Sequence, residues 1–410
     1  MQTQLSTEFL GTADGTEAEA ILRKCVHCGF CTATCPTYQL LGDELDGPRG
    51  RIYLIKQVLE GEAVTRKTQI HLDRCLTCRN CESTCPSGVQ YGRLVEIGRH
   101  IVDQKVERPA AEMALRWGLK VGLTSQAFGP AMKLGQAVRH LLPAALKRKV
   151  PARAAVGAHR WPTREHPRKV LLLLGCVQPA MMPNVNSATA RVLDAAGLQT
   201  LVADGSGCCG AIRSHLGDRS GGLDDMRRNV DAWWPLVATN QVEAIVMNAS
   251  GCGVTVKEYG HALARDPAYA DRAKRVADLT RDLSELLPDL VPRLKPKLRP
   301  LKTRLLALHP PCTLQHGQQL RDSIEAPLAE LGFEVRLAPA ESHLCCGSAG
   351  TYSVMQPKLA TELRDRKLAQ LDRVEAQLIV SANIGCIQHL QSGTTTPVKH
   401  WIEVVDEAIG

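Results

Sequence analysis

Two cysteine runs with the same spacing are the residues of this chain best suited to chemistry. Each run places two residues between its first three cysteines, three residues before its fourth, and a proline directly after the fourth. This is the ligand pattern of two-cluster bacterial ferredoxins, in which thiolates hold [4Fe–4S] clusters. The pattern therefore predicts two clusters that carry electrons one at a time. The cysteines are Cys25, Cys28, Cys31 and Cys35, followed by Cys75, Cys78, Cys81 and Cys85.

The fourth cysteine of each run is expected to serve the cluster of the other run. Spacers of two residues aim three consecutive thiolates at the corners of one cube, whereas the longer spacer and the proline send the fourth away. The crossing ligands would also hold the two segments together. We expect one cluster on Cys25, Cys28, Cys31 and Cys85, and a second cluster on Cys75, Cys78, Cys81 and Cys35.

Zinc and disulfides fit these eight cysteines less well. One zinc site needs only four thiolates and has no use for a third cysteine six positions after the first. Disulfides are disfavoured because the first residues, MQTQLSTEFL, lack the apolar core of a secretory signal, which indicates a reducing compartment.

The composition bounds the rest of the chain. Its 410 residues are enough for two or three domains, and a hydrophobic content of 44% can fill their cores. Aromatic residues make up only 4%, which disfavours stacking on single-stranded nucleic acid, and no apolar run is long enough for a transmembrane helix. The formal net charge is +8, and two oxidised clusters with their thiolates, at roughly −2 each, would bring it to about +4.

The elements that position the two runs are expected to be helices. Residues 14–24 have a helical pattern before the first run, and a Gly-Pro pair at 47–48 starts a second helix whose apolar stripe ends at Gly61. Near the start of that helix, Arg49 and Arg51 either supply cations to a negatively charged cluster or form a solvated first turn.

A basic connector, residues 108–168, follows. Residues 108–169 hold thirteen Lys and Arg against two acids, Glu112 and Glu165, with apolar residues scattered among them. The stretch is either a basic amphipathic surface that touches an anionic membrane or a solvated helical spacer. Proline and glycine interrupt the pattern, which favours the spacer.

From residue 169 onward the chain reads as α/β and repeats itself. Each copy has an apolar strand leading to a cysteine, a helix, a strand leading to Cys-Cys-Gly, another helix, and a strand leading to a last cysteine. The first cysteine precedes Cys-Cys-Gly by 32 positions in one copy and by 33 in the other, so we infer a duplication. Continuous apolar strands that alternate with helices predict buried parallel sheets.

Every cysteine of the two copies comes just after a strand. Because sites in parallel sheets gather beyond the carboxyl ends of the strands, four thiols per copy can converge on a further cluster or a zinc ion. Alternatively, these cysteines simply pack in the core or form a labile disulfide. Nearby His309, His343 and His389 are expected to be structural. The first set is Cys176, Cys208, Cys209 and Cys252, and the second set is Cys312, Cys345, Cys346 and Cys386.

The chain resembles the iron–sulfur subunits of bacterial glycolate oxidase over nearly its whole length. The likeness is carried by CVHCGFCTATCPTYQLLGDELDGPRGRIYLIKQVLEG, LDRCLTCRNCESTCPSGV and HLCCGSAGTY. Related subunits occur in lactate-utilisation, anaerobic glycerol-3-phosphate dehydrogenase and heterodisulfide reductase complexes. Heterodisulfide reductase repeats end in Cys-x-x-Cys, whereas Thr255 and His389 stand at the matching second positions here, which argues against a cluster that needs a fifth thiol.

The resemblance implies an electron-transfer subunit. Glycolate would be oxidised to glyoxylate on FAD held by partner flavoprotein subunits, and this chain would pass the electrons through two [4Fe–4S] clusters to a membrane acceptor, expected to be quinone. It implies a peripheral place on the cytoplasmic side of the inner membrane and no nucleic-acid partner. The chain has no GxGxxG after a strand and no P-loop, so we expect no dinucleotide site and no catalytic residue of its own.

We therefore predict an α+β multidomain fold. An α-helical two-cluster ferredoxin domain would span 1–107, the connector 108–168, and two duplicated α/β repeats with parallel strands 169–298 and 299–410. Two alternatives for function remain. One is the iron–sulfur subunit of another flavin-linked 2-hydroxyacid or glycerol-3-phosphate dehydrogenase, and the other is a thiol–disulfide enzyme similar to heterodisulfide reductase.

Overall fold

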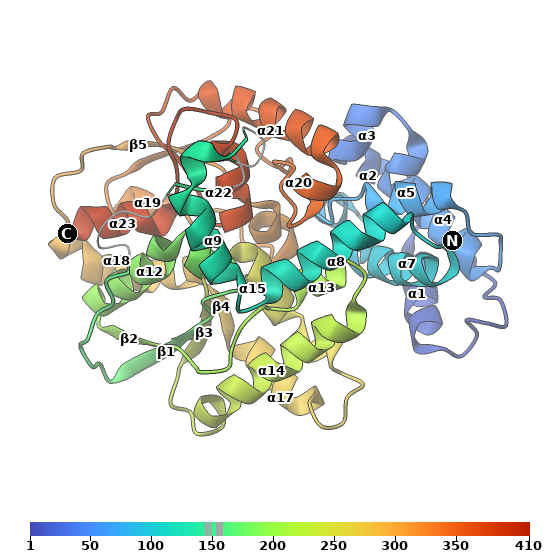
Figure 1. Ribbon diagram of the computed structural model, residues 1–410, viewed down its shortest axis with the longest axis horizontal. Coiled ribbons are helices and arrows are strands. Elements are labelled where there is room, and N and C mark those ends of the chain that lie inside the picture. Colours follow the sequence, from blue (N-terminus) through green and yellow to red (C-terminus); the bar gives the residue numbers. More distant parts are fainter. Residues whose placement is uncertain (144–146, 148–149, 153–158) are drawn as a thin grey trace.

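A computed structural model places a helical N-terminal unit beside two α/β units (Figure 1). It describes residues 1–143, 147, 150–152 and 159–410, so part of the predicted connector lies outside the described residues. Within the described residues no helix is both long enough and apolar enough to cross a bilayer.

The N-terminal unit is built from short helices around the two cysteine runs. The helices predicted at 14–24 and from 47–48 onward are confirmed. The first is capped by Thr12, whose hydroxyl accepts from the backbone N–H of Gly15, and the second begins with a proline in its first turn. The elements are α1 (Ala13–Lys24), α2 (Phe30–Ala33), α3 (Pro36–Leu41), η1 (Glu44–Asp46), α4 (Pro48–Leu59), α5 (Arg66–Asp73), α6 (Asn80–Thr84) and α7 (Tyr91–Lys105).

A strap of helices follows and lies across the near face of the molecule in Figure 1. We use "the strap" for residues 110–141, which comprise α8 (Ala110–Thr124), α9 (Phe128–Ala137) and the 3₁₀ turn η2 (Arg139–Leu141). No residue of these three elements is buried.

The first α/β unit holds a four-stranded parallel sheet in the order β2-β1-β3-β4. Val170 of β1 pairs with Ala244 of β3, and the paired residues 170–172 and 244–246 are apolar and buried, as expected for a sheet covered on both faces. The elements are β1 (Arg168–Leu172), α11 (Gln178–Met181), α12 (Pro183–Ala195), β2 (Leu198–Leu201), α13 (Ala211–His215), α14 (Arg219–Ala238), β3 (Ala244–Met247), α15 (Ser250–Lys257), α16 (Tyr259–Ala262), α17 (Ala270–Leu279), β4 (Thr280–Asp282), α18 (Leu283–Leu294) and η3 (Lys295–Lys297).

The second α/β unit repeats this topology, with strand order β6-β5-β7-β8 and all neighbours parallel. The predicted fold class is therefore confirmed, although the domain boundaries themselves stay predictions. The elements are β5 (Leu305–Leu308), η4 (Thr313–Gly317, a π-helical turn), α19 (Glu325–Glu330), β6 (Glu334–Leu337), α20 (Tyr352–Met355), α21 (Pro357–Asp372), β7 (Ile379–Ser381), α22 (Ile384–Gln391), β8 (Val398–His400) and α23 (Trp401–Ile409).

The two α/β units share one hydrophobic core. A single buried cluster takes in Val170 and Val246 from the first sheet and Leu306 and Val380 from the second. The C-terminal helix α23 packs on α12 of the first unit, where Arg191 also forms an ion pair with Asp406 at 2.6 Å. Burial on this scale is the main stabilising term for such a pair of sheets.

Candidate metal centres

The first predicted thiol set lies around a cavity that opens at the surface of the N-terminal unit. Cys25 ends α1, Cys31 lies in α2 and Cys85 ends α6, and with Cys28 they line this cavity, together with Cys81. Cys28 is exposed, whereas Cys25 is buried. The structure thus brings together three cysteines of the first run and the fourth cysteine of the second run.

The loop that presents these thiols depends on Gly29. Its φ is +86°, and a Cβ on it would lie 2.7 Å from Nη1 of Arg49. A side chain at this position would therefore strain the turn and displace the guanidinium. Arg49 itself lines the cavity and pairs with Glu44 at 2.6 Å.

The chemistry of this set fits a metal group held by thiolates. Burial and the neighbouring thiols of Cys25, Cys28 and Cys85 raise the pKa of Cys31 to about 11. Four thiolates this close repel one another, so they ionise together only when a bound cation balances their charge. Four cysteine sulfurs are the donor set of [4Fe–4S] clusters, and the predicted cofactor therefore fits the residues present.

The second predicted set lies deeper, between the N-terminal unit and the second α/β unit. Burial, followed by the other thiols of the set, raises the pKa of Cys81 well above its ordinary value. Cys75 is the exception: its burial acts to raise the pKa, but Arg51 and Arg99 outweigh it, and the pKa lies below its ordinary value. One member of this set therefore loses its proton more readily than an ordinary cysteine thiol. The four cysteines are Cys35, Cys75, Cys78 and Cys81.

Hydrogen bonds reach two sulfurs of the second set. The Thr77 N–H donates to Sγ of Cys75 at 3.4 Å and the Tyr91 hydroxyl donates to the same sulfur at 3.6 Å. Sγ of Cys35 lies 3.3 Å from Oγ1 of Thr37. Hydrogen bonds to ligand sulfurs are one of the levers that set the reduction potential of a cluster.

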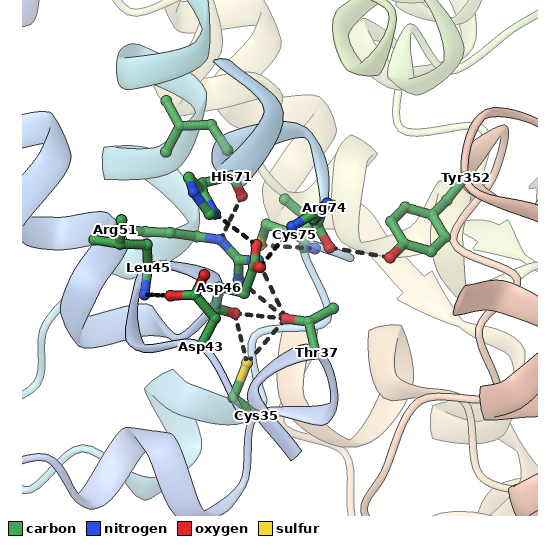
Figure 2. Close-up of polar contacts among 12 residues, drawn as sticks. Cys35, Thr37, Asp43, Leu45, Asp46, Arg51, His71, Arg74, Cys75 and Tyr352 are labelled. Atoms are coloured by element: carbon green, nitrogen blue, oxygen red, sulfur yellow. Dashed lines mark hydrogen bonds and ion pairs between the residues drawn. The ribbon is translucent and has the colours of Figure 1, made fainter. Parts of the chain in front are cut away.

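A buried charge network supports the second set, and Figure 2 shows it between Cys35 and Cys75. Arg51 is 1% exposed and Asp46 is fully buried, with 3.4 Å between Nη2 and Oδ1. Arg74 adds a second cation at 2.8 Å from Oδ2 of Asp46. Of the two interpretations of the arginines, a solvated first turn is wrong for Arg51, because its guanidinium is enclosed beside the thiols.

The cysteines of the first α/β unit converge beyond the carboxyl ends of its strands. Cys176 hydrogen-bonds with Cys208, and Cys209 hydrogen-bonds with Cys252. Hydrogen bonds from Cys176, Cys209 and the Gly210 N–H lower the pKa of Cys208. The four thiols that the sequence grouped in this copy therefore lie together in space.

The second α/β unit repeats the arrangement. Sγ of Cys312 lies 3.7 Å from Sγ of Cys345, and Cys346 hydrogen-bonds with Cys386. All four thiols are buried.

This second group of α/β thiols adjoins the second ferredoxin-type set. Burial is the largest cause of the raised pKa of Cys78, and the nearby thiol of Cys312 is the second. Cys78 in turn acts to raise the pKa of Cys345. Leu76, Cys312, Cys345 and Tyr352 form one buried cluster against which Cys78 packs. The sequence did not predict this contact, because nothing in the local spacing reports how the units pack.

Two of the three histidines near the second copy contact protein groups through their rings. Nδ1 of His309 lies 3.1 Å from Oγ of Ser381, and Nε2 of His389 donates to the carbonyl of Ala360 at 3.0 Å. His343 is half-buried.

Sequence reasoning missed His316, whose ring bridges the N-terminal and second α/β units. Its Nδ1 lies 3.0 Å from Oγ of Ser83, and its Nε2 donates to the carbonyl of His343 at 2.9 Å.

Comparison with known proteins identifies the same three parts of the chain. Residues 21–89 match the family described as 4Fe-4S dicluster domain, and residues 170–257 and 306–391 each match the family described as cysteine-rich domain. Both cysteine runs fall inside the first match.

Full-length relatives are also found. The glycolate oxidase iron-sulfur subunit of Escherichia coli (strain K12) is 54% identical over 100% of this chain and 99% of its own length. The probable glycolate oxidase iron-sulfur subunit of Bacillus subtilis (strain 168) is 30% identical over 95% of this chain and 92% of its own length. Lactate utilization protein A of Bacillus velezensis is 26% identical over 54% of this chain and 90% of its own length.

Proposed function

Because the chain belongs to the family of glycolate oxidase iron–sulfur subunits, we propose that it relays electrons from a flavin on partner subunits to a membrane quinone. Oxidation of glycolate to glyoxylate releases two electrons onto FAD held by flavoprotein subunits, and this chain takes them up and passes them on. The observation that carries the proposal is the convergence of two cysteine runs into two sets of four thiols.

The two sets hold one [4Fe–4S] cluster each, with crossed ligands. Each cluster, when bound, supplies a one-electron step, so a pair divides the two electrons of a reduced flavin. The chain's own residues provide the thiolates, bury three of the four cysteines of the second set and place cations beside it. The first cluster is held by Cys25, Cys28, Cys31 and Cys85, and the second by Cys75, Cys78, Cys81 and Cys35.

The exposure of the two sets gives the relay a direction. Cys28 is exposed, and Val26 and Phe30 beside it are large apolar side chains that also face solvent. Such a rim suits a transient or stable contact with a flavoprotein subunit. The second set is enclosed by the second α/β unit, so electrons enter at the first set and continue to the second.

The cysteines of the two α/β units are candidates for binding a further metal group beyond the second cluster. The contact of Cys78 with Cys312 and Cys345 supports a further cluster or a zinc ion in the second copy. The matching set in the first copy has the same chemistry, four cysteine sulfurs, and is assigned the same two candidates.

A thiol–disulfide activity is the second candidate function. It is favoured by the 3.7 Å separation of Cys312 and Cys345, which would need only a small shift to form a disulfide. Reduction of a disulfide substrate by the full chain would have to disappear in Cys345→Ser and Cys346→Ser while the ferredoxin-type clusters stay intact. Lack of reaction with every disulfide tried would eliminate this candidate.

The family and the proposed quinone acceptor together support a peripheral position of this chain on the cytoplasmic side of the inner membrane. No nucleic-acid partner is proposed, since the aromatic content is 4%. Another flavin-linked 2-hydroxyacid or glycerol-3-phosphate dehydrogenase would use the same relay, and turnover of the purified complex with each substrate distinguishes them.

Iron analysis combined with EPR spectroscopy tests the relay. Anaerobically purified chain is expected to contain about eight irons if only the ferredoxin-type sets are filled, and about twelve or sixteen if the α/β sets also hold clusters. Cys25→Ser and Cys75→Ser are expected to remove different EPR signals of the reduced protein and to stop electron flow from glycolate beyond the flavin.

Crossed ligation makes a sharper prediction. Cys85→Ser is expected to perturb the signal that Cys25→Ser perturbs, and Cys35→Ser the signal that Cys75→Ser perturbs. The opposite pairing would reject the crossed assignment. A folded, colourless and iron-free protein would reject the relay altogether.

A further inference from the structure

Helix α8 of the strap is amphipathic, with its polar side turned inward. The charged residues of α8 are Glu112, Arg116 and Lys120, which share one side of the helix at a spacing of four. All three are partly enclosed and form ion pairs with the body of the protein. The partners of the two cations are Asp73 at 3.2 Å and Asp218 at 3.1 Å.

The outward side of α8 is apolar. Trp117 is 64% exposed, and Val121 lies one turn further along the same stripe. The small residues of α8 are exposed as well, so its solvent-facing side carries no charged group. Soluble proteins rarely leave such a patch uncovered unless something docks on it. The exposed large apolar side chains of the strap are Met113, Leu115, Trp117, Val121, Leu134 and Leu141.

The charge of the surrounding sequence indicates what covers this patch. From residue 113 to residue 164 the chain contains no Asp or Glu and ten Lys and Arg, eight of which are not the inward-paired Arg116 and Lys120. A basic segment with outward tryptophan and leucine is the composition that binds anionic bilayers, where the apolar side enters the boundary between headgroups and acyl chains. Tryptophan in particular prefers the depth of the headgroups.

We propose that the outward side of the strap is a membrane-docking surface that inserts into an anionic lipid bilayer. The inward ion pairs of α8 fix the helix to the protein, so the apolar side chains enter lipid without the helix leaving the body. The inference deepens the proposed delivery of electrons to a membrane quinone. Lipid binding is measured without oxidation of glycolate, however. Membrane docking by the strap and electron delivery to quinone can therefore fail independently of each other.

Vesicle sedimentation tests the surface with the full, iron-loaded chain. Vesicles of phosphatidylglycerol and phosphatidylethanolamine are expected to bind the chain, and more salt to weaken the binding. Trp117→Gln combined with Val121→Gln is expected to lower the affinity by about tenfold or more, because two apolar side chains no longer enter lipid. Leu10→Gln is the matched control, since Leu10 is 68% exposed on the N-terminal unit, and binding should be unchanged.

Quenching by brominated lipid separates insertion from mere charge attraction. Bromine on the acyl chains is expected to quench part of the tryptophan fluorescence of the chain, and Trp117→Phe is expected to remove that part while binding persists. Equal binding of the double variant and the parent would overturn the proposal. So would absence of vesicle binding together with protection of the strap by the flavoprotein subunits, which would assign the surface to a protein partner.

Discussion

At the scale of the residue, Arg51 illustrates how the N-terminal unit prepares for negatively charged cofactors. Burying an ion pair brings little net stability compared with apolar residues of similar volume. Arg51 is nevertheless enclosed, hydrogen-bonded to the His71 carbonyl at 2.7 Å and placed so that it lowers the pKa of Cys75. A cation at this place would favour the added electron when a bound cluster is reduced.

Arg51→Met tests this role. We expect the reduction potential of the second cluster to fall, because reduction adds negative charge that the guanidinium no longer balances. The buried Asp46 loses one of its partners, and the free energy of unfolding should fall by about 3–5 kcal/mol. Redox titration followed by EPR measures the first effect and chemical denaturation the second.

The control is Arg168→Met, because Arg168 forms an ion pair with Glu243 in which both side chains are more than a third exposed. Its loss should cost less than about 1 kcal/mol and leave both potentials unchanged. An unaltered potential in Arg51→Met would contradict the proposed role of the buried cation.

His400 gives a pH-dependent contribution to stability. Its Nδ1 accepts from the Ile402 N–H at 3.1 Å at the start of α23, and burial lowers its pKa from 6.5 to about 3. Below pH 6.5 the unfolded chain binds a proton that the folded chain does not, so this contribution is complete above pH 6.5 and falls as the pH approaches 3. The expected slope is about 1.4 kcal/mol per pH unit for this one group.

His400→Asn removes the titrating ring while it keeps a good N-cap. Between pH 6.5 and pH 5 the free energy of unfolding of the variant is expected to fall less steeply with pH. The difference in slope approaches the value for one bound proton, about 1.4 kcal/mol per pH unit. Denaturation at several pH values measures it, and a slope equal to that of the unsubstituted chain would refute the assignment.

At the scale of the element, the two Cys-Cys-Gly turns explain why glycine ends each motif. Gly210 has a φ of +94° and Gly347 a φ of +88°. A Cβ on Gly210 would lie 2.7 Å from the carbonyl of Gly222, and one on Gly347 would lie 2.6 Å from the carbonyl of Ala360. Each turn therefore combines a left-handed conformation with a close approach to a helix backbone.

Gly210→Ala and Gly347→Ala are each expected to cost about 1–3 kcal/mol, from backbone strain and the displaced carbonyl. Gly207→Ala is the control in the same loop as Gly210, because no atom lies within 4 Å of its added Cβ. Thermal unfolding compares the three variants. If Gly207→Ala lost as much stability as the other two variants, any substitution in this loop would be destabilising, and the turn geometry of Gly210 and Gly347 would not be the cause.

The elements also show how far the sequence predicts this molecule. The cysteine runs and α4 were predictable, because spacing and a Gly-Pro start are local signals. Two strands, β4 (Thr280–Asp282) and β8 (Val398–His400), were missed, since each has three residues and leads directly into a helix. The contact of Cys78 with Cys312 and the inward side of α8 depend on packing between units, which no local pattern reports.

At the scale of the whole molecule, the N-terminal unit is joined to both α/β units. Arg79 donates to Glu258 of the first unit at 2.5 and 2.9 Å, and the hydroxyl of Tyr352 in the second unit donates to the Arg74 carbonyl at 3.1 Å. These contacts fix the second thiol set against the α/β thiols. The chain therefore acts as one body rather than as a ferredoxin on a tether.

Removal of iron is expected to unfold part of the N-terminal unit while the two α/β units stay folded. The helices α2 and α6, which carry thiols of both sets, have four and five residues and are too short to be stable alone. Without metal we expect the segment 25–90 to lose helical signal and become sensitive to protease, because metal binding and folding are coupled. The two sheets should persist on their shared core, as measured by circular dichroism and limited proteolysis. Equal protection of 25–90 in both forms would contradict this.

The core common to the two sheets also bears on the history of the repeat. Helix α23, at the end of the second copy, covers α12 of the first through Trp401 and Val405, both completely buried. A single ancestral copy of the repeat would have exposed this apolar helix face to water. Such a copy would have needed to pair with a second copy around a twofold axis, and fusion into one polypeptide would have made that pairing permanent.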